Sequence, residues 1–417
     1  MVSTSFRVYP ISQILRTAST ALVIAMGSHA YGQWTFVNLH PPGSTFSQAK
    51  GVKGGQQVGV ALDSGGYRAG FWTGTPDSWI ALSPAGAPAS FAQAVSTSGT
   101  RQVGTRTSPA PIEAFIWSGS MGSQVSLNPP GATISTVNDI YGDRQGGMVN
   151  YRAALWYGTD ASFVDLNPPG VQYSGLTAIY GYQQVGSVGG HAYLWTGTAA
   201  SAVDLHPAQS GAFSSSLSGV HRGHQVGVVP FYDPNGEQDF NHAGLWSGTA
   251  ASWIDLHPPS NGQPEISAST ATAVYHTQQV GWISTGGNSN AFAAHWTGSA
   301  ASYFSLHSVL PPEYTLSQAF DIWSDSVHTY VVGYGYNSAV GQNQALMWLG
   351  PPIPAPPAPG DVDGDDDIDL DDAAAFFNCM LGPDVSTPSD CSGARMDTDT
   401  DVDMLDFAEF QVAFGGP

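Results

Sequence analysis

The chain has 417 residues, of which 42% are hydrophobic and 10% are charged, with 50 glycines and 29 prolines. This composition indicates a globular protein that is rich in turns. Most of the net charge of −21 comes from residues 361–417, where 16 acidic side chains stand against one basic side chain. Because lysine and arginine are scarce, nucleic acids and anionic membranes are excluded as main partners, whereas cations suit the acidic end.

Residues 1–32 are predicted to be a secretory signal peptide. Arg7 and Arg16 precede a short apolar run at 17–27, and small residues follow it. The run is too short to span a bilayer, and no other stretch is apolar enough for a transmembrane anchor. We therefore expect a secreted, extracellular protein, free or associated with the cell surface. The alternative for this segment is a buried N-terminal helix.

One sequence unit recurs seven times between residues 34 and 350. Each of the first six copies has Trp, then Gly at +2, Ser at +6 and Leu at +10, and Leu39 supplies the seventh Leu. The tryptophans return every 39 to 52 residues, at Trp72, Trp117, Trp156, Trp195, Trp246, Trp296 and Trp348. A period of this size is the signature of a repeat architecture.

Each unit has the pattern of about four short strands. The residue two before the Leu is apolar and the residue three before it is aromatic in five copies, which predicts a strand packed on both faces. Proline-rich turns such as 40–43 end that strand, and a Gln-Val-Gly triplet marks a second strand of the unit. Seven such units predict an all-β, seven-bladed β-propeller over residues 33–350. The alternatives are a β-solenoid and a string of separate small sheets.

The units resemble the extracellular HAF-type repeats of bacteria, whose copies read Val-Gly, a polar loop and then His-Ala-Phe-Leu-Trp. The match rests on His191-Ala-Tyr-Leu-Trp195 and His242-Ala-Gly-Leu-Trp246, with looser copies at 113–117 and 290–296. This resemblance covers most of the chain. It implies a bacterial secreted protein and brings no activity with it.

Residues 351–360 are predicted to be a stiff, proline-rich linker. Beyond it, residues 361–372 place carboxylates at positions 1, 3, 5, 7, 9 and 12 of a loop, which is the spacing with which a 12-residue loop wraps Ca²⁺. We expect position 7 to use its backbone carbonyl. The candidate ligands of this loop are Asp361, Asp363, Asp365, Asp367, Asp369 and Asp372.

A second loop lies 34 residues later, at 395–406, and an apolar helix is predicted at 407–414. Arg395 takes the first ligand position, and a cation cannot coordinate calcium. We therefore expect this site to be weaker, or to bind through a water molecule. Its candidate ligands are Asp397, Asp399, Asp401, Asp403 and Asp406.

The two loops, each closed by Asp and followed by a helix, resemble the dockerin type I domain, an EF-hand relative that lacks the first helix. The resemblance spans residues 361–414. It implies a small α-helical module that binds two calcium ions and docks onto cohesin domains, commonly in secreted polysaccharide-degrading proteins. Cys379 and Cys391 also lie within 361–417, and an even pair in an exported chain predicts a disulfide. A cysteine metal site and an acidic disordered tail are the alternatives.

The repeats contain no recognisable catalytic motif. Aspartates recur before the repeated Leu and histidines recur after it, so we interpret both as turn residues rather than as a ring of metal ligands. They are Asp165, Asp204, Asp255, His40, His206, His257 and His307. The longest loop, at 233–239, carries alternating oxygen donors and is a further candidate calcium loop.

These patterns together predict a secreted, non-enzymatic binding or assembly protein. The propeller is expected to bind a polysaccharide or a protein, and the calcium module a cohesin-like or cell-surface partner. The alternative is a secreted glycan hydrolase with two loop carboxylates in the propeller. The carboxylates without a counterpart in other repeats are Asp139, Asp143, Glu237 and Asp321.

Overall fold

The computed structural model describes residues 34–83, 91–108, 111–232, 240–259, 266–286 and 290–353, and then 360–362, 368, 370–380, 382, 391, 394–396 and 401–415. The predicted signal peptide, the loop at 233–239 with Glu237, and residues 354–359 of the predicted linker lie outside this set. Among the described residues, no helix is both long enough and apolar enough to cross a membrane.

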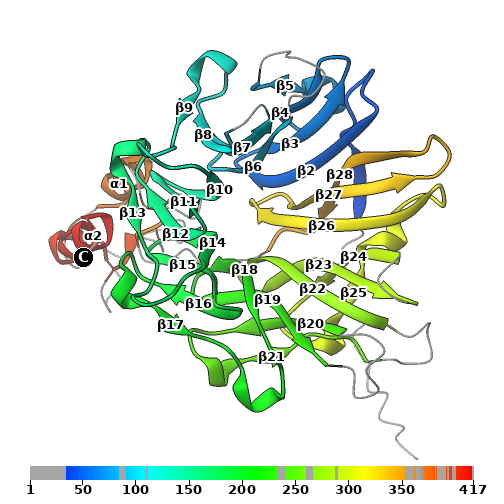
Figure 1. Ribbon diagram of the computed structural model, residues 1–417. Coiled ribbons are helices and arrows are strands. Elements are labelled where there is room, and N and C mark those ends of the chain that lie inside the picture. The colour runs from blue at the N-terminus through cyan, green and yellow to red at the C-terminus, as the bar shows by residue number, and fades with distance from the viewer. Residues whose placement is uncertain are drawn as a thin grey trace, which may run out of the picture. The chain divides into compact units, whose positions relative to one another are not determined.

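The repeats form a seven-bladed β-propeller, as predicted. Each blade has four antiparallel strands, and the blades surround a central axis (Figure 1). One parallel pair, Tyr67 with Phe91, joins the sheets of blades 1 and 2. Blade 1 is β2 (Phe46–Lys53), β3 (Gln56–Asp63), β4 (Gly66–Trp72) and β5 (Ile80–Ala81); blade 2 is β6 (Phe91–Thr97), β7 (Gln102–Ser108), β8 (Glu113–Trp117) and β9 (Val125–Ser126). Blade 3 is β10 (Ser135–Tyr141), β11 (Arg144–Val149), β12 (Arg152–Trp156) and β13 (Val164–Asp165); blade 4 is β14 (Ser174–Tyr180), β15 (Gln183–Val188), β16 (His191–Trp195) and β17 (Val203–Asp204).

The remaining blades repeat this order. Blade 5 is β18 (Ser216–His221), β19 (His224–Phe231), β20 (Phe240–Trp246) and β21 (Ile254–Asp255); blade 6 is β22 (Ile266–Tyr275), β23 (Gln278–Thr285), β24 (Asn290–Trp296) and β25 (Phe304–Ser305). Blade 7 combines β26 (Tyr314–Ser324), β27 (Thr329–Asn337) and β28 (Gln342–Gly350) with β1 (Thr35–Asn38). Because β1 pairs with β28, strands from the two ends of the repeat region close the ring.

The repeated tryptophans and leucines fill the interfaces between blades. All seven tryptophans are at most 2% exposed and the seven repeated leucines are fully buried. The Trp246 indole N–H donates to the carbonyl oxygen of Leu205 in the preceding unit, at 2.9 Å. Trp348 makes the same contact with Leu306, at 3.0 Å. The period therefore reflects a large side chain that packs between blades in every unit, and in these two units it also forms a hydrogen bond to the preceding unit.

Buried glutamines explain why Gln, Gly and Ser recur together. The Gln184 side-chain oxygen accepts the N–H of Gly197 at 2.7 Å, and Ser201 closes the 3₁₀ turn η4 (Ala199–Ser201) by donating to the carbonyl of Thr198 at 2.7 Å. The same bonds to glutamine occur in five other blades, from Gly74, Gly119, Gly158, Gly248 and Gly298. The equivalent 3₁₀ turns of the other blades are η1 (Pro76–Ser78), η2 (Met121–Ser123), η3 (Asp160–Ser162), η6 (Ala250–Ser252) and η7 (Ala300–Ser302). Two further 3₁₀ turns, η5 (Ala208–Ser210) and η8 (Leu306–Val309), lie outside this motif.

The strand before the repeated Leu differs from its prediction. It has two residues in most blades and forms the outer edge of the sheet, so one of its faces meets solvent. Ile80 is 46% exposed and Val203 is also 46% exposed, whereas we expected both faces to be packed. The reason is that this strand is the outermost of its blade: among the described strands none pairs with its outer edge, and short edge strands limit unwanted pairing.

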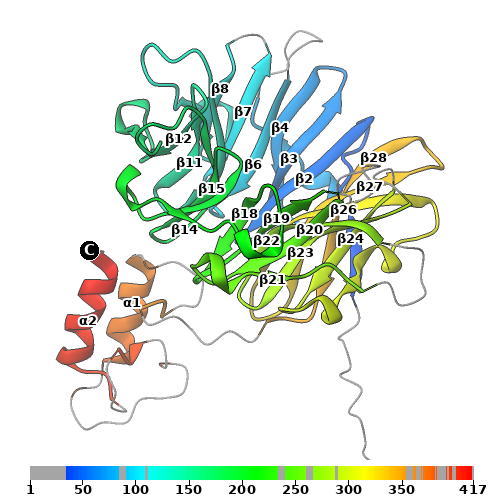
Figure 2. The same cartoon turned by 60° about the horizontal axis from the view of Figure 1, so that its bottom comes forward.

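The C-terminal residues form two helices, α1 (Leu370–Cys379) and α2 (Met404–Gly415), which lie side by side in both views (Figures 1 and 2). Phe376 and Phe410 are buried between them, with ring centroids 4.7 Å apart. Cys379 and Cys391 form the predicted disulfide. Ile368 and Val402, which occupy the same position in the two loops, both pack into this core.

Candidate functional site

The two C-terminal loops are closed in the same way. The Asp372 carboxylate accepts the backbone N–H of Val362 at 2.6 Å, and the Asp406 carboxylate accepts that of Met396 at 2.6 Å. In each loop the twelfth residue thus reaches back to the second residue. Asp372 and Asp406 are both fully buried. The 34-residue repeat in the sequence is therefore a repeat in three dimensions as well.

Three carboxylates of the second loop converge. Ligand oxygens of Asp401, Asp403 and Asp406 all lie within 4.8 Å of one another. Asp403 and Asp406 are held in place because the N–H of Asp403 donates to Asp406 at 2.9 Å and the N–H of Leu405 donates to Asp403 at 2.7 Å. One cation that binds oxygens at about 2.3–2.6 Å can contact all three, so this donor set fits a hard metal ion.

The other predicted ligands are only partly described. Asp361 is buried at the start of the first loop. Asp401 was expected to offer its backbone carbonyl, but its side chain belongs to the carboxylate cluster. Asp363, Asp365, Asp367, Asp369, Asp397 and Asp399 lie outside the described residues.

The repeated aspartates and histidines of the propeller are turn residues, as predicted. Asp204 accepts the N–H of His206 at 2.8 Å, and His206 contacts the Ser215 hydroxyl at 3.0 Å. In the next blade, Asp255 accepts the N–H of His257 at 2.8 Å, and the His257 ring contacts the Ser269 hydroxyl at 2.9 Å. These bonds fasten one unit to the next strand. Burial and the neighbouring His242 lower the pKa of His257 to about 4, so it is neutral near pH 7.

A β-bulge in every inner strand shapes the channel along the propeller axis. The pairing register shifts at the same point in all seven strands, which leaves one extra residue on each. These residues are Lys50, Val95, Asn138, Thr177, Ser218, Thr272 and Phe320, and they line a cavity of about 130 Å³. Six of them stand nine residues before the repeated Gly of their blade. The sequence contains this spacing, but the six residues are of different types, so the pattern does not stand out.

The structure brings Asp139 and Asp321 together in this channel. They occupy the position after the bulge in blades 3 and 7, where the other blades have Gly51, Ser96, Ala178, Gly219 and Ala273. Asp139 accepts the Ser96 hydroxyl at 2.6 Å and the N–H groups of Ile140 and Ile179 at 2.8 Å. Asp321 accepts the N–H of Val52 at 2.8 Å and that of Ile322 at 2.9 Å. Each carboxylate thus joins its own blade to a neighbouring one.

Burial raises the pKa of both carboxyl groups. For Asp321 the pKa rises to about 7, first because of burial and then because Asp139 carries like charge, although the Val52 N–H opposes the shift. Asp143, another candidate from the sequence, lies outside this arrangement: its side chain is 73% exposed.

The raised pKa of Asp321 predicts a pH-dependent stability. A carboxyl group whose native pKa of about 7 exceeds its ordinary value of 3.8 stabilises the fold below about pH 4, and this contribution is lost as the pH rises through 7. We expect Asp321→Asn to flatten the dependence of unfolding free energy on pH between 4 and 7. Urea denaturation followed by tryptophan fluorescence measures it, with Asp143→Asn as control. An unchanged slope in Asp321→Asn would contradict the assignment.

Aromatic rings gather at one end of the channel, around a second cavity of about 90 Å³. The rings of Tyr141 and Tyr180 are 4.9 Å apart, those of Tyr180 and His221 are 4.3 Å apart, and those of His221 and Tyr275 are 4.5 Å apart. Each of these residues stands three positions after the bulge of its strand. His221 and Tyr275 are buried, so this arc is mainly a packed rim.

No family model matches the chain, and no curated protein does. Several solved structures are similar to it in part. A prolyl endopeptidase aligns with 75% of this chain and 51% of its own length, at 10% identity and a TM-score of 0.45. The polysaccharide lyase Uly1 aligns over 74% of this chain and 90% of its own, at 9% identity and a TM-score of 0.39. The GH74 xyloglucanase from Xanthomonas campestris aligns over 73% of this chain and 54% of its own, at 10% identity and a TM-score of 0.43. This chain thus spans about half the length of the endopeptidase and of the xyloglucanase.

Proposed function

We propose that the chain is a secreted, non-enzymatic binding or assembly protein, in which a calcium-dependent C-terminal module attaches the propeller to a partner. The propeller takes a polysaccharide or protein ligand. A cohesin-like protein or a cell-surface component is the proposed partner of the module. The disulfide supports export, because disulfides persist in oxidising compartments.

The identical closure of the two loops carries this proposal. Asp372 and Asp406 reach their partners at the same distance, 2.6 Å, from the same loop position. The aspartate carboxylates of each loop lie within 12 consecutive residues, and their negative charges repel one another unless a cation is present. Binding of Ca²⁺ through carboxylate oxygens would relieve that repulsion, so metal binding is expected to couple to folding of the module.

Calcium titration of the full chain, stripped of metal with a chelator, tests the proposal. We expect two sites by isothermal titration calorimetry, a tighter one in the first loop and a weaker one in the second, where Arg395 replaces a ligand. Asp372→Asn should weaken the tighter site at least about tenfold, and Asp406→Asn should weaken the other, because each removes a charged ligand. Asp143→Asn in the propeller is the matched control.

Limited proteolysis provides a second readout of the same variants. Calcium should protect residues 361–417 of the parent chain from cleavage, and this protection should fall in Asp372→Asn. Absence of binding heat, together with cleavage that a chelator does not change, would overturn the calcium assignment.

A further inference from the structure

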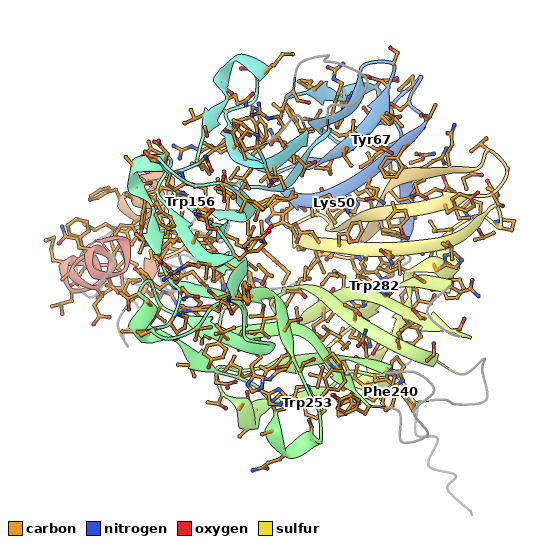
Figure 3. The ribbon with its side chains drawn as sticks, in the orientation of Figure 1. Lys50, Tyr67, Trp156, Phe240, Trp253 and Trp282 are labelled. Atoms are coloured by element: carbon orange, nitrogen blue, oxygen red, sulfur yellow. A yellow bond between two sulfur atoms is a disulfide. The ribbon has the colours of Figure 1, made fainter. Side chains whose placement is uncertain are left out.

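Lys50 places a positive charge in the propeller channel. It is the extra residue of the bulge in β2, it is half-buried, and Figure 3 labels it at the inner ends of the blades. Its ammonium group lies 3.9 Å from the centre of the Phe320 ring. In the described part of the chain, no carboxylate forms an ion pair with this ammonium group. Burial lowers the pKa of Lys50 to about 8, so the charge is retained at pH 7.

Two other residues of the cavity lining, Asn138 and Thr272, offer hydrogen-bond acceptors. Asn138, which is exposed in the channel, uses its amide N–H to donate to the carbonyl of Leu176 at 2.6 Å, which leaves its side-chain oxygen toward other donors. The hydroxyl of Thr272 shares its one proton between the carbonyl oxygens of Val280 and Ala319, each at 3.0 Å. Its lone pairs remain able to accept.

The two aspartates of the channel do not cancel the charge of Lys50. Their oxygens accept backbone N–H groups from Ile179 and Val52, and neither carboxylate forms an ion pair with Lys50 in the part of the chain that the structure describes. An anion that approaches Lys50 therefore meets an ammonium group that is not paired with a carboxylate, and Asn138 and Thr272 line the same cavity. A carboxylate satisfies the ammonium with a charge-assisted bond, which is stronger in a water-poor channel than at the surface.

We infer that the axial channel binds a small hydroxylated carboxylate of the uronic acid class, with its carboxylate on Lys50 and its hydroxyl groups donating to Asn138 and Thr272. The cavity of about 130 Å³ takes the carboxylate and the nearest hydroxyl groups of such a ligand, at the end of an acidic glycan. This inference rests on the proposed function in one respect, namely that the propeller binds a ligand. It does not depend on calcium.

Three matched probes on the full chain test the inference: galacturonate, which has both the carboxylate and the hydroxyl groups, galactose, which lacks the carboxylate, and acetate, which lacks the hydroxyl groups. Ligand-observed NMR and calorimetry should show galacturonate binding more tightly than either of the other two. Lys50→Met, which keeps a similar chain length without the charge, should weaken galacturonate at least about tenfold. Arg152→Met, which removes an exposed positive charge of blade 3 outside the cavity lining, should leave the affinity unchanged.

The inference is overturned if galacturonate does not bind, if acetate or galactose binds as tightly, or if Lys50→Met and Arg152→Met behave alike. Thermal unfolding checks that Lys50→Met is folded, and Lys50→Gln replaces it if it is not. Each titration is run with calcium and with chelator. Galacturonate binding that persists in chelator, alongside absent calcium binding, would overturn the calcium module and keep the channel site. The reverse result would overturn the channel site alone.

Discussion

Replacing Gly186 with alanine should destabilise the propeller by about 3 kcal/mol or more, because the new methyl group has no space. Gly186 lies on β15 opposite the bulge of β14, and a Cβ there would meet the carbonyl oxygen of Gly175 at 1.9 Å. Backbone atoms cannot move aside as a flexible side chain does. The two strands would have to separate, with loss of their hydrogen bonds.

Gly175 supplies the matched control for this variant. It lies on the neighbouring strand, and a Cβ built on it has nothing within 4 Å. Gly175→Ala should therefore change the unfolding free energy by less than about 0.5 kcal/mol. Urea denaturation of both variants, followed by tryptophan fluorescence, measures the difference. Equal stabilities would contradict the role assigned to the repeated glycine.

The same steric limit explains the glycine of the repeat in five other blades. The built Cβ would lie 1.9 to 2.0 Å from an inner-strand carbonyl oxygen at Gly59, Gly147, Gly227, Gly281 and Gly333. Gly147 shows that the third unit, whose Gln-Val-Gly triplet is degenerate in the sequence, keeps the residue that matters. The Gln is retained too, since Gln145 still accepts the N–H of Gly158.

The sequence revealed the blades because their determinants repeat as residue types. A buried Trp, a buried Leu and the Gln-to-Gly bond each need one particular side chain, so they return with a readable period. The calcium loops were readable for a similar reason, since the candidate ligands fall within 12 consecutive residues and the loop closure depends on Asp372 and Asp406.

The channel could not be predicted in this way. Its lining comes from seven strands that are far apart in the chain, and the bulge requires a backbone geometry rather than a side chain. Lys50, Val95 and Phe320 therefore occupy one structural position without sharing any chemistry. Asp139 and Asp321 stood out as unmatched carboxylates, but only the closed ring shows that they lie in the same channel.

Replacing Asp139 with alanine should lower the unfolding free energy by about 3 kcal/mol. The variant removes the acceptor of the Ile140 and Ile179 N–H groups and of the Ser96 hydroxyl, and a buried donor left without a partner costs about 1–3 kcal/mol. Part of this loss is offset because a buried carboxyl group is removed. Asp139→Asn, which retains one acceptor oxygen, should lose less.

Asp143→Ala is the control, since that side chain is exposed and should change stability by less than about 0.5 kcal/mol. Chemical denaturation of the three variants measures the series. A glycan hydrolase would need a carboxyl group free to transfer a proton or attack the sugar. Both oxygens of Asp139 are instead occupied by groups from three blades. If Asp139→Ala were as stable as the parent chain but abolished a glycan-hydrolysing activity of the parent, the pair would be catalytic and the role of Asp139 as a link between blades would be wrong.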